Sequence, residues 1–548
     1  MMNDYCWNDK NKKKRVIKMR FLLVNPYYPM SEGPSPPLGL SFLGAALERA
    51  GIEVKVLDLV VFPYSKTILR SVLNDFQPDF VGSTAVTMSF HNAIQVIQDV
   101  KEIDPAIFTV MGGPHVTFCA ENTMESFPEL DVIVLGEGED TLVQLVTAAG
   151  NGKTWDSING IVYRNGSGLQ RTAEKKAYLE VDSLPMPARH LLPLGRYRAL
   201  NMPINMTTSR GCPFKCIFCV GRKMVGAKVR YRNAKLVVDE MEHLVQLGFS
   251  QINLADDLFT ANEKHCIDIC NEILKRNLKV KWTSFARVDT VSPGVLSKMK
   301  EAGCTAISFG IETGNEEILK TIQKKITTSQ VRDAVKMCND SGIQPCGSFI
   351  LGLPGETPET IQETVAFGDS LKKMNLAYGF HLLAPFPGTL VREDAEQYGL
   401  KILTDDWSEY HANRAVAETP SVNKEMLDNI AIEWEENIEK WLGHIQERIK
   451  TGEATEEEAF PLVNLERTVL IYDLMMQDIL STYGCWEQEG SASVSKKDAL
   501  HMLIQRIPDS IKYPRERIFT ELQSQLEKEN LRFRNDNGRI AWEWVDYL

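Results

Sequence analysis

The sequence has no apolar run long enough to cross a membrane, and its first residues lack the apolar segment and small-residue cleavage site of a signal peptide. It also lacks an excess of positive charge, because 61 Lys and Arg residues face 73 Asp and Glu residues, giving a net charge of −12. General nucleic-acid binding depends on clustered positive charge. We therefore expect a cytoplasmic protein with no membrane span and no nucleic-acid partner.

Cysteine is too sparse for a disulfide scaffold, since 11 cysteines, an odd number, are spread over 548 residues. Secreted disulfide scaffolds are short and dense in cysteine, so reduced thiols are expected here. The single basic stretch, residues 10–20, indicates a solvated, disordered N-terminus (residues 1–19) rather than an arm for an anionic partner. A chain of this length should form two or three domains.

Three thiols are nevertheless concentrated within eight residues, at Cys212, Cys216 and Cys219. A zinc site normally has four ligands at short spacings, whereas this loop offers three thiols and no adjacent His. Iron–sulfur clusters usually take one Cys per iron, so three thiolates on a four-iron cluster would leave one iron open. A zinc site completed by a distant residue such as His190 or His243 is the alternative.

The C-x-x-x-C-x-x-C spacing, with Phe218 directly before the last Cys, resembles the signature of the radical S-adenosylmethionine (SAM) superfamily. The resemblance implies a 4Fe-4S cluster whose open iron binds the amino and carboxylate groups of SAM. Cys266 and Cys270 are the closest rival pair, but helical cysteines separated by apolar residues are more often core. The other cysteines, not expected to bind the cluster, are Cys6, Cys119, Cys304, Cys338, Cys346 and Cys485.

Residues 20–150 alternate between short apolar runs and helical stretches, which predicts a doubly wound, flavodoxin- or Rossmann-like parallel sheet. The expected strands are Phe21–Val24, Glu53–Leu57, Asp79–Ala85, Ala106–Met111 and Asp131–Leu135. The expected helices are Leu38–Ala50, Phe90–Glu102, Val116–Ser126 and one from Asp140. Ligands of such sheets bind at the carboxyl ends of the strands, where this domain places glycines and small polar residues.

Together with the cysteine motif, the Gly-Gly-Pro-His and Gly-Glu-Gly-Glu stretches of these loops resemble the cobalamin-binding domain of cobalamin-dependent radical SAM enzymes. The Asp-x-His-x-x-Gly motif that supplies an axial His in the mutases is absent, so a corrin here would lack that ligand. A loop histidine hydrogen-bonded to the backbone is the alternative for His115. The residues assigned to cobalamin are Asn25, Ser83, Thr84, Gly112, Gly113, His115, Gly136, Glu137, Gly138 and Thr141.

After a hairpin and an extended linker (residues 151–203), a second α/β region covers residues 204–420. Its helices should stop at Gly248, Gly303 and Gly342. Six βα units fit the incomplete (β/α)6 barrel of radical SAM enzymes, with the cysteine loop after the first strand. The expected strands are Ile204–Ser209, Gln251–Leu254, Val280–Phe285, Thr305–Phe309, Pro345–Leu351 and Ala377–Leu383.

Polar residues follow these strands, and the chemistry of a parallel barrel lies at the carboxyl ends of its strands. The resemblance implies that Asp256 or Asp257 binds the SAM amino group, against a helix N-cap for one of them. Arg287 with Asp289 could pair with the SAM carboxylate, against a surface ion pair. The residues assigned to SAM are Asp256, Asp257, Arg287, Ser308, Glu312, Gly352 and Pro385. An ordinary turn with Thr357 as N-cap is the alternative after the fifth strand.

Residues 421–548 are acidic and mainly helical, with a small winged-helix-like module expected at the end. The resemblance as a whole implies a radical SAM enzyme that forms a 5′-deoxyadenosyl radical and methylates an unactivated carbon through methylcobalamin. An unidentified small-molecule substrate and a reductant such as ferredoxin or flavodoxin are the expected partners. The alternatives are an oxidative cyclase, as in the anaerobic Mg-protoporphyrin monomethyl ester cyclase group, and a non-catalytic corrinoid or redox sensor.

Overall fold

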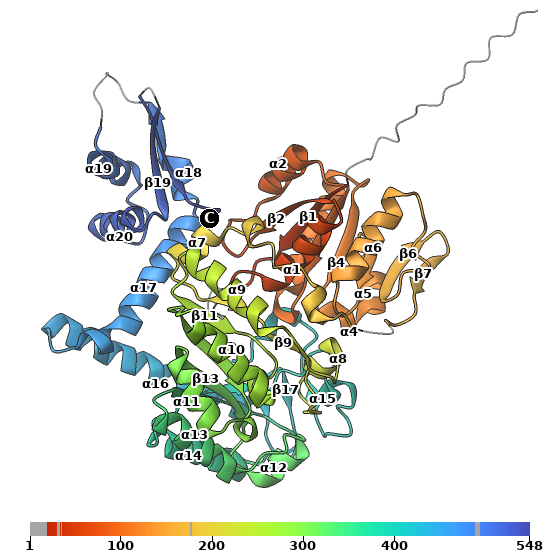
Figure 1. Cartoon of the computed structure of the whole chain (residues 1–548), viewed down its shortest axis with the longest axis vertical. Helices are drawn as coiled ribbons and strands as arrows, with labels where there is room; N and C mark the ends of the chain where they lie inside the picture. Colours follow the sequence, from red (N-terminus) through yellow and green to blue (C-terminus); the bar gives the residue numbers. More distant parts are fainter. Residues whose placement is uncertain (1–18, 30–32, 34, 176–177, 488–493, 537) are drawn as a thin grey trace, which may run out of the picture.

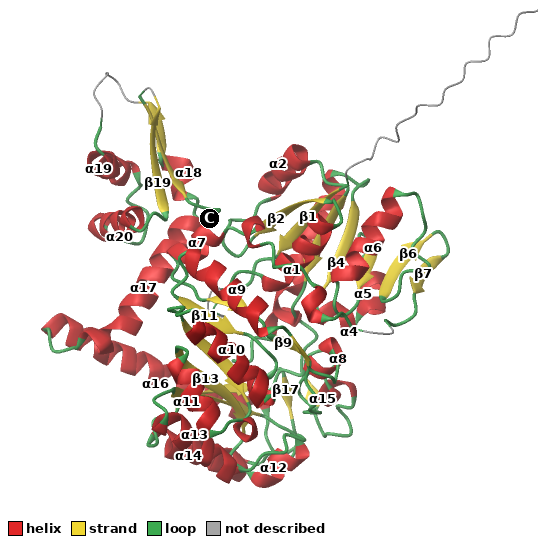
Figure 2. Cartoon of the chain, in the orientation of Figure 1, coloured by secondary structure: helices red, strands yellow, loops and turns green. Residues whose placement is uncertain are grey.

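The computed structural model describes residues 19–548 except 30–32, 34, 176–177, 488–493 and 537. The predicted disordered N-terminus, apart from its last residue, therefore lies outside the described residues, as does Cys6. The chain forms two sheets with their helices, followed by a helical arm and a small C-terminal module (Figures 1 and 2).

The first sheet confirms the predicted doubly wound fold, with five parallel strands in the order β2-β1-β3-β4-β5. These strands are β1 (Arg20–Asn25), β2 (Glu53–Asp58), β3 (Phe80–Thr84), β4 (Phe108–Gly112) and β5 (Val132–Val134). One face packs on α1 (Leu38–Arg49) and α6 (Glu139–Gly150), and the other on α2 (Lys66–Phe76), α3 (Phe90–Ile103), α4 (Pro114–Phe118) and α5 (Ala120–Ser126). Alternate apolar residues of each strand supply the two cores.

The hairpin expected between the domains is part of the first sheet. Its strands, β6 (Ile161–Asn165) and β7 (Gly168–Arg171), add antiparallel to β5. Its inner strand is buried, because Ile161, Val162 and Tyr163 pack into the cores of the sheet. The first sheet therefore has seven strands within the described residues.

The second sheet has six parallel strands in sequential order, as expected for a partial (β/α)6 barrel. They are β8 (Ile204–Met206), β11 (Gln251–Leu254), β12 (Lys281–Ala286), β13 (Cys304–Glu312), β14 (Gln344–Leu351) and β15 (Ala377–Leu382). The covering helices are α9 (Ala234–Gln246), α10 (Glu263–Lys275), α11 (Pro293–Glu301), α12 (Glu316–Thr321), α13 (Thr328–Asp340) and α14 (Pro358–Lys372). Gly248, Gly303 and Gly342 follow helices with positive φ, as the sequence predicts.

The loop after β8 contains three short elements that the sequence did not reveal. The predicted strand Ile204–Ser209 ends at Met206, and β9 (Ser209–Arg210) instead pairs antiparallel with β10 (Arg230–Tyr231). The short helix α8 (Gly221–Val225) lies between them. The three cysteines therefore lie within a loop closed at its base by a two-stranded ladder.

The chain then forms α15 (Leu390–Glu393) and the hairpin β16 (Lys401–Ile402) and β17 (Ala417–Glu418). The arm is built from α16 (Lys424–Thr451), α17 (Glu456–Met476) and α18 (Ile479–Tyr483). The C-terminal module has a three-stranded antiparallel sheet with two helices: β18 (Cys485–Glu487), α19 (Lys496–Arg506), α20 (Arg515–Glu527), β19 (Leu531–Asp536) and β20 (Arg539–Trp544).

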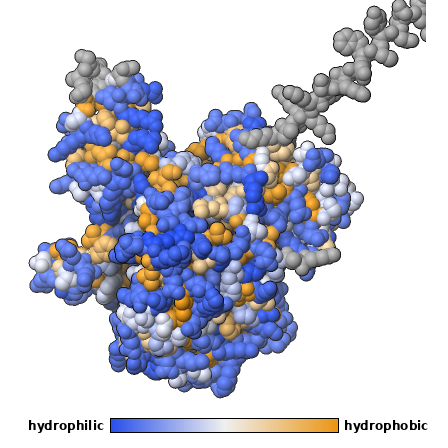
Figure 3. Space-filling view, in the orientation of Figure 1, coloured by the Kyte–Doolittle hydropathy of each residue, from blue (hydrophilic) through white to orange (hydrophobic). Residues whose placement is uncertain are grey.

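The chain end returns to the linker, where Gly195 N–H and Arg196 Nε of α7 (Leu194–Ala199) donate to Asp546 at 2.9 and 2.7 Å. The visible face of the molecule is mostly hydrophilic, with scattered apolar side chains (Figure 3). None of the helices in the described ranges is long and apolar enough to span a membrane.

Candidate active site

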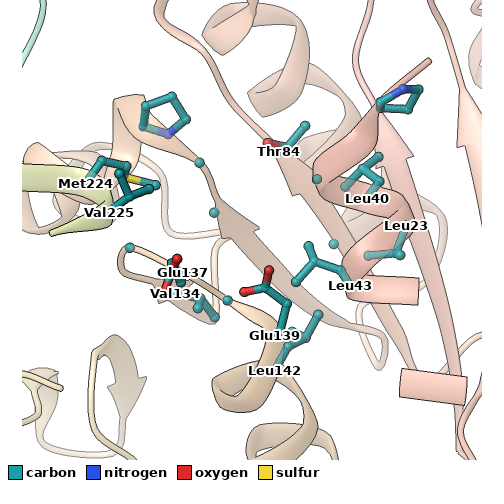
Figure 4. A pocket seen from close by; sticks show the side chains of 18 of the residues that line it. Leu23, Leu40, Leu43, Thr84, Val134, Glu137, Glu139, Leu142, Met224 and Val225 are labelled. Atoms are coloured by element: carbon teal, nitrogen blue, oxygen red, sulfur yellow. The ribbon is translucent and has the colours of Figure 1, made fainter. Parts of the chain in front are cut away.

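A cavity of about 410 Å³ lies where the carboxyl ends of the first sheet meet the cysteine loop of the barrel. Its size falls in the range of small-molecule sites. The sequence-predicted residues that line it are Ser83, Thr84, Gly112, Gly113, Gly136, Glu137, Gly138 and Asp257. Apolar side chains of β1, α1 and α6, including Leu23, Leu43 and Leu142, form another part of the wall (Figure 4).

Two of the glycines are needed where they stand. Gly113 has a φ of 104°, and a Cβ there would come 2.6 Å from Ala85 O. Gly136 has a φ of 64° at the turn after β5. The cavity wall formed by Gly112, Gly113, Gly136 and Gly138 therefore carries no side chains. We call this part of the wall the glycine cradle, and its bare backbone suits the close approach of a large, flat ligand such as a corrin.

Three residues assigned to cobalamin do not line this cavity. Asn25 Nδ2 donates to Asp58 Oδ1 at 2.8 Å, and Tyr197 OH donates to the other oxygen of Asp58 at 2.8 Å. Burial raises the pKa of Asp58 to about 6, against the effect of these hydrogen bonds. Thr141 is buried at a neighbouring cavity. The structure thus places Asn25 in a network that ties β1 and β2 to α7.

His115, the third of these residues, is 2% exposed and packs the two domains together. Its ring lies 4.3 Å from the Phe90 ring and 4.9 Å from that of Trp407, which follows the last barrel strand. Nδ1 is 3.3 Å from Thr87 Oγ1, so its partner is a side chain rather than the backbone. Burial lowers the pKa of His115 to about 3, so the ring is neutral at pH 7.

An ion network joins the domains along one edge of the cavity. Arg210 Nη1 donates to Glu139 Oε1 at 2.7 Å and to Glu137 Oε1 at 3.3 Å. Arg230 donates to Glu137 Oε1 and Oε2 at 2.7 and 3.0 Å. The guanidinium of Arg210 also lies 4.8 Å from the ring centre of Phe42 on α1. The cysteine loop is therefore fixed against the first domain.

The two adjacent aspartates after β11 have different roles. Asp256 is 3% exposed and accepts three hydrogen bonds of 2.6 Å, from Thr208 N–H, Thr208 OH and Ser209 OH. Burial raises its pKa to about 6 despite these bonds. Asp256 thus anchors the start of the cysteine loop, and its oxygens are already occupied.

Asp257 lines the cavity and also contacts the cysteine loop. Its Oδ2 accepts from Gly211 N–H at 3.1 Å. A Cβ built on Gly221 would lie 3.5 Å from both Asp257 Oδ1 and Cys219 Sγ. Of the two aspartates, Asp257 is therefore the one placed between the cavity and the cysteines.

The donor set of the cysteine loop fits a cluster. Cys212 and Cys216 are partly buried, Cys219 is exposed, and Cys219 Sγ accepts a hydrogen bond from Gly221 N–H at 3.3 Å. Partial burial raises the pKa of the Cys216 thiol, while the positive charges of Lys324 and Arg287 act against this. In the described part of the chain, no three Cys, His, Asp or Glu side chains form a group that could hold a metal ion. A single metal ion needs its ligands gathered around one point, whereas in a four-iron cluster each thiolate binds a different iron, so the thiols can stand farther apart.

The histidines of the zinc alternative lie on other elements. His190 Nε2 lies 3.0 Å from Glu48 Oε1 on α1, and the His190 side chain is exposed. His243 lies in the last turn of α9.

Arg287 is a buried residue that supports the cysteine loop, not a surface ion pair. It donates to Asp289 at 2.9 and 3.0 Å and to Lys324 O at 2.8 Å. Its guanidinium lies 3.6 Å from the ring centre of Phe214, between the first two cysteines. This positive charge thus lies against the loop that carries the thiols.

Glu312 forms a buried ion pair with Lys324, at 2.5 Å between Oε1 and Nζ. Its φ of 70° and the register shift after Gly310 interrupt the regular end of β13. Such a backbone conformation in a bulky residue is costly and is typical of functional sites. Lys324 was missed by sequence analysis because it follows α12, far from the strand end that it neutralises.

The remaining residues assigned to SAM follow or lie within β13, β14 and β15. Gly352, with a φ of 87°, donates its N–H to Glu356 Oε2 at 2.7 Å. Burial raises the pKa of Glu356 to about 7. Thr357 also caps α14, with Pro358 in its first turn. Pro385 O accepts from Arg392 at 3.1 Å.

Ser308 lies in β13 beside an exposed residue of the neighbouring strand. It pairs in register with Phe285 of β12 and Cys346 of β14. Phe285 is 52% exposed, although its strand lies inside the sheet rather than at an edge. The neighbouring residues Trp282, Phe309 and Phe349 face the buried helical side, so the row of Phe285, Ser308 and Cys346 faces the barrel interior.

Comparison with known proteins shows a radical SAM superfamily domain over residues 206–368 and a B12 binding domain over residues 30–146. An uncharacterized methyltransferase of Pyrococcus horikoshii is 38% identical over 68% of this chain and 81% of its own length. The anaerobic magnesium-protoporphyrin IX monomethyl ester cyclase of Rubrivivax gelatinosus is 30% identical over 75% of this chain and 76% of its own.

Solved structures share the fold. The cobalamin-dependent SAM radical enzyme OxsB, with aqua-cobalamin and SAM bound, has a TM-score of 0.67 at 18% identity, covering 94% of this chain and 81% of its own. The radical SAM methyltransferase TsrM of Kitasatospora setae has a TM-score of 0.61 at 22% identity, covering 73% and 86%. The chain is thus an enzyme whose cofactors are a 4Fe-4S cluster, SAM and cobalamin. It belongs to the radical SAM superfamily, in the group whose members carry a B12-binding domain.

Proposed function

We propose that this enzyme is a cobalamin-dependent C-methyltransferase that modifies an unactivated carbon of a small molecule. The observation that carries the proposal is the position of Asp257, which lines the cavity and also accepts a hydrogen bond from Gly211 N–H of the cysteine loop, next to Cys212. A corrin in this cavity would face the place where the substrate radical forms. Reacting groups must come within about 3–3.5 Å, so methyl transfer requires such apposition.

When bound, the cluster supplies the electron that cleaves SAM to a 5′-deoxyadenosyl radical, and cobalamin carries the methyl group. The chain's own residues bind, orient and shield these groups. Cys212, Cys216 and Cys219 hold the cluster, and Asp257 is proposed to accept from the SAM amino group. The other residues proposed to hold SAM are Arg287, Ser308, Glu312, Gly352 and Pro385, whereas Asp256 anchors the loop.

The glycine cradle is proposed to hold the corrin, with Ser83, Thr84 and the Gly136–Gly138 turn at its edge. None of the cradle residues is a His, and His115 is enclosed between Phe90 and Trp407. A protein His beneath the cobalt is therefore not expected. The reductant is proposed to be a ferredoxin or flavodoxin, and the location the cytoplasm.

The second candidate function is radical oxidation without methyl transfer, as in a cyclase. Identity of 30% to the Rubrivivax gelatinosus cyclase favours it. Identity to the Pyrococcus horikoshii methyltransferase is higher, at 38%. The same cavity and cysteine loop would serve both reactions, so only the fate of the SAM methyl group separates them.

The test follows that methyl group and needs no knowledge of the substrate. Protein reconstituted anaerobically with cluster and cobalamin is given methyl-labelled SAM and a strong reductant. A methyltransferase should move the label to the corrinoid with release of S-adenosylhomocysteine, and it should also form 5′-deoxyadenosine. Formation of 5′-deoxyadenosine with an unlabelled corrinoid would contradict methyl transfer and favour the cyclase. Protein with Cys216→Ala should form no 5′-deoxyadenosine.

A further inference from the structure

The interdomain ion network contains one incomplete member, Glu139. Its Oε1 accepts from Arg210 at 2.7 Å, whereas Oε2 is buried and has no hydrogen-bond partner among the described residues. Both oxygens of Glu137, two residues earlier, are occupied by arginines. A buried polar atom without a partner is costly, and a carboxylate oxygen can accept more than one hydrogen bond.

Glu139 is placed to meet a ligand of the cavity. It is the first residue of α6, it lines the cavity, and its side chain is 6% exposed. Figure 4 shows its carboxylate pointing away from α6 into the space bordered by Leu43 and Glu137. A ligand group that reached this point would therefore compete with little water for the carboxylate.

The Glu139 carboxylate favours a ligand group that donates a hydrogen bond. An ionised carboxylate only accepts hydrogen bonds, and among the described residues Arg210 donates to it while the Lys175 ammonium interacts with it through charge alone. A second anion beside it would be repelled, whereas an N–H donor would complete its hydrogen bonding. Cobalamin carries a ring of primary carboxamides around its corrin, and each offers an N–H donor.

We infer that Glu139 binds a peripheral carboxamide of the corrin and, through Arg210, joins the corrin to the cysteine loop. This inference rests on the proposed placement of cobalamin in the cavity. Arg210 is in β9, two residues before Cys212, and Arg230 of the paired strand β10 completes the network. Glu139 is thus a positioning residue that links the two cofactor sites of the enzyme.

A consequence of this link is reciprocal coupling. If a corrin bond orders Glu139 and Arg210, then corrin binding also orders the loop that holds the cluster, and cluster binding favours the corrin by the same factor. The coupling is lost when the cavity-facing oxygen is removed. It can be measured by comparing cobalamin affinity in protein with and without the reconstituted cluster.

The test replaces the hydrogen-bond acceptor of the protein by a donor, and the carboxamide donors of the ligand by carboxylate acceptors. In Glu139→Gln, the amide oxygen must face the Arg210 donors, so the NH2 group is left for the ligand. The dissociation constant of hydroxocobalamin should rise about tenfold, the scale of one charge-assisted hydrogen bond. Cobyrinic acid, whose side chains are carboxylates, should instead bind more tightly to this variant than to the wild type. The cluster-dependent gain in cobalamin affinity should shrink as well.

Two variants serve as controls. Glu137→Gln perturbs the same network at a residue whose oxygens are already occupied, so both corrinoids should change by the same factor. Glu139→Asp keeps the charge, so it should disfavour cobyrinic acid as the wild type does. If Glu139→Gln fails to fold, Glu139→Asp is titrated with hydroxocobalamin instead: its carboxylate is one methylene farther from the ligand, so the dissociation constant should rise, and an unchanged constant would overturn the inference.

Each outcome of the titrations decides one point. If Glu139→Gln raised the dissociation constants of both corrinoids by the same factor, the role of Glu139 would be purely structural and the inference would be overturned. Unchanged dissociation constants would overturn it too. Failure of the wild type to bind hydroxocobalamin would instead overturn the proposed placement of cobalamin.

Discussion

Cys216→Ala should leave the chain unable to hold its four-iron cluster. Each thiolate binds one iron, and the loop supplies three thiols for three irons, so the loop has no fourth thiol to replace the missing one. Anaerobic reconstitution of the variant should give protein without the broad visible absorbance of the cluster. Iron and sulfide should fall to background, and reduction in the presence of SAM should produce no 5′-deoxyadenosine.

Cys346→Ala is the matched control for this experiment, because it removes a partly buried thiol from β14 without touching the loop. It should retain the iron and sulfide of the wild type. Full retention of both by Cys216→Ala would contradict the assignment of the cluster. Zinc in place of iron in the wild type would support the zinc alternative.

Asp256→Ala should destabilise the folded protein strongly. The substitution leaves three buried donors, two on Thr208 and one on Ser209, without their acceptor. Each unpaired donor costs about 1–3 kcal/mol, so we expect the free energy of unfolding to fall by about 3–5 kcal/mol. Denaturant unfolding of the metal-free protein measures this loss, and folded variant protein should also take up less cluster.

Asp268→Ala is the control for that measurement. Asp268 pairs with Lys264 at 2.6 Å on the exposed face of α10. Exposed pairs of this kind contribute about 0.3–0.5 kcal/mol, so its unfolding should match that of the wild type closely. An unfolding free energy of Asp256→Ala equal to that of Asp268→Ala would show that Asp256 does not anchor the loop.

The pattern of apolar runs and the glycines at helix ends were sufficient to predict the two parallel sheets. Buried strands such as Phe21–Val24 are continuous apolar runs, and Gly248, Gly303 and Gly342 mark helix ends. The helix α2 was not predicted, although its apolar residues Ile68, Leu69, Val72, Leu73 and Phe76 stand at helical spacing. The ladder of β9 and β10 was not predicted either, since two-residue strands have no period to detect.

The candidate site was predictable where a single loop carries the chemistry. The spacing of Cys212, Cys216 and Cys219 is local, so the motif was visible in the sequence. Arg210 and Glu139 are separated by 71 residues, and their ion pair arises only from the docking of two domains. The glycine turn beside Glu139 could therefore be identified from the sequence, but the link from it to the cysteine loop could not.

The aspartate pair after β11 illustrates a different limit. Adjacent residues of an extended segment face opposite sides, so the sequence indicated that Asp256 and Asp257 differ in role. It could not show which of them is buried, because both follow Ala255 and precede a loop. In the folded chain Asp256 is buried and hydrogen-bonded to Thr208 and Ser209, whereas Asp257 lines the cavity.

Electron paramagnetic resonance of the holoprotein tests the proposed corrin site most directly. Protein purified with cobalamin is reduced to the Co(II) state, once with natural nitrogen and once with the protein labelled with ¹⁵N. We predict a bound corrinoid whose Co(II) spectrum shows no splitting from a protein nitrogen and is identical in the two samples. Splitting that changes with the ¹⁵N label would mean that a protein His binds the cobalt, which would contradict a corrin seated on the glycine cradle. Absence of any bound corrinoid at micromolar cobalamin would contradict it equally.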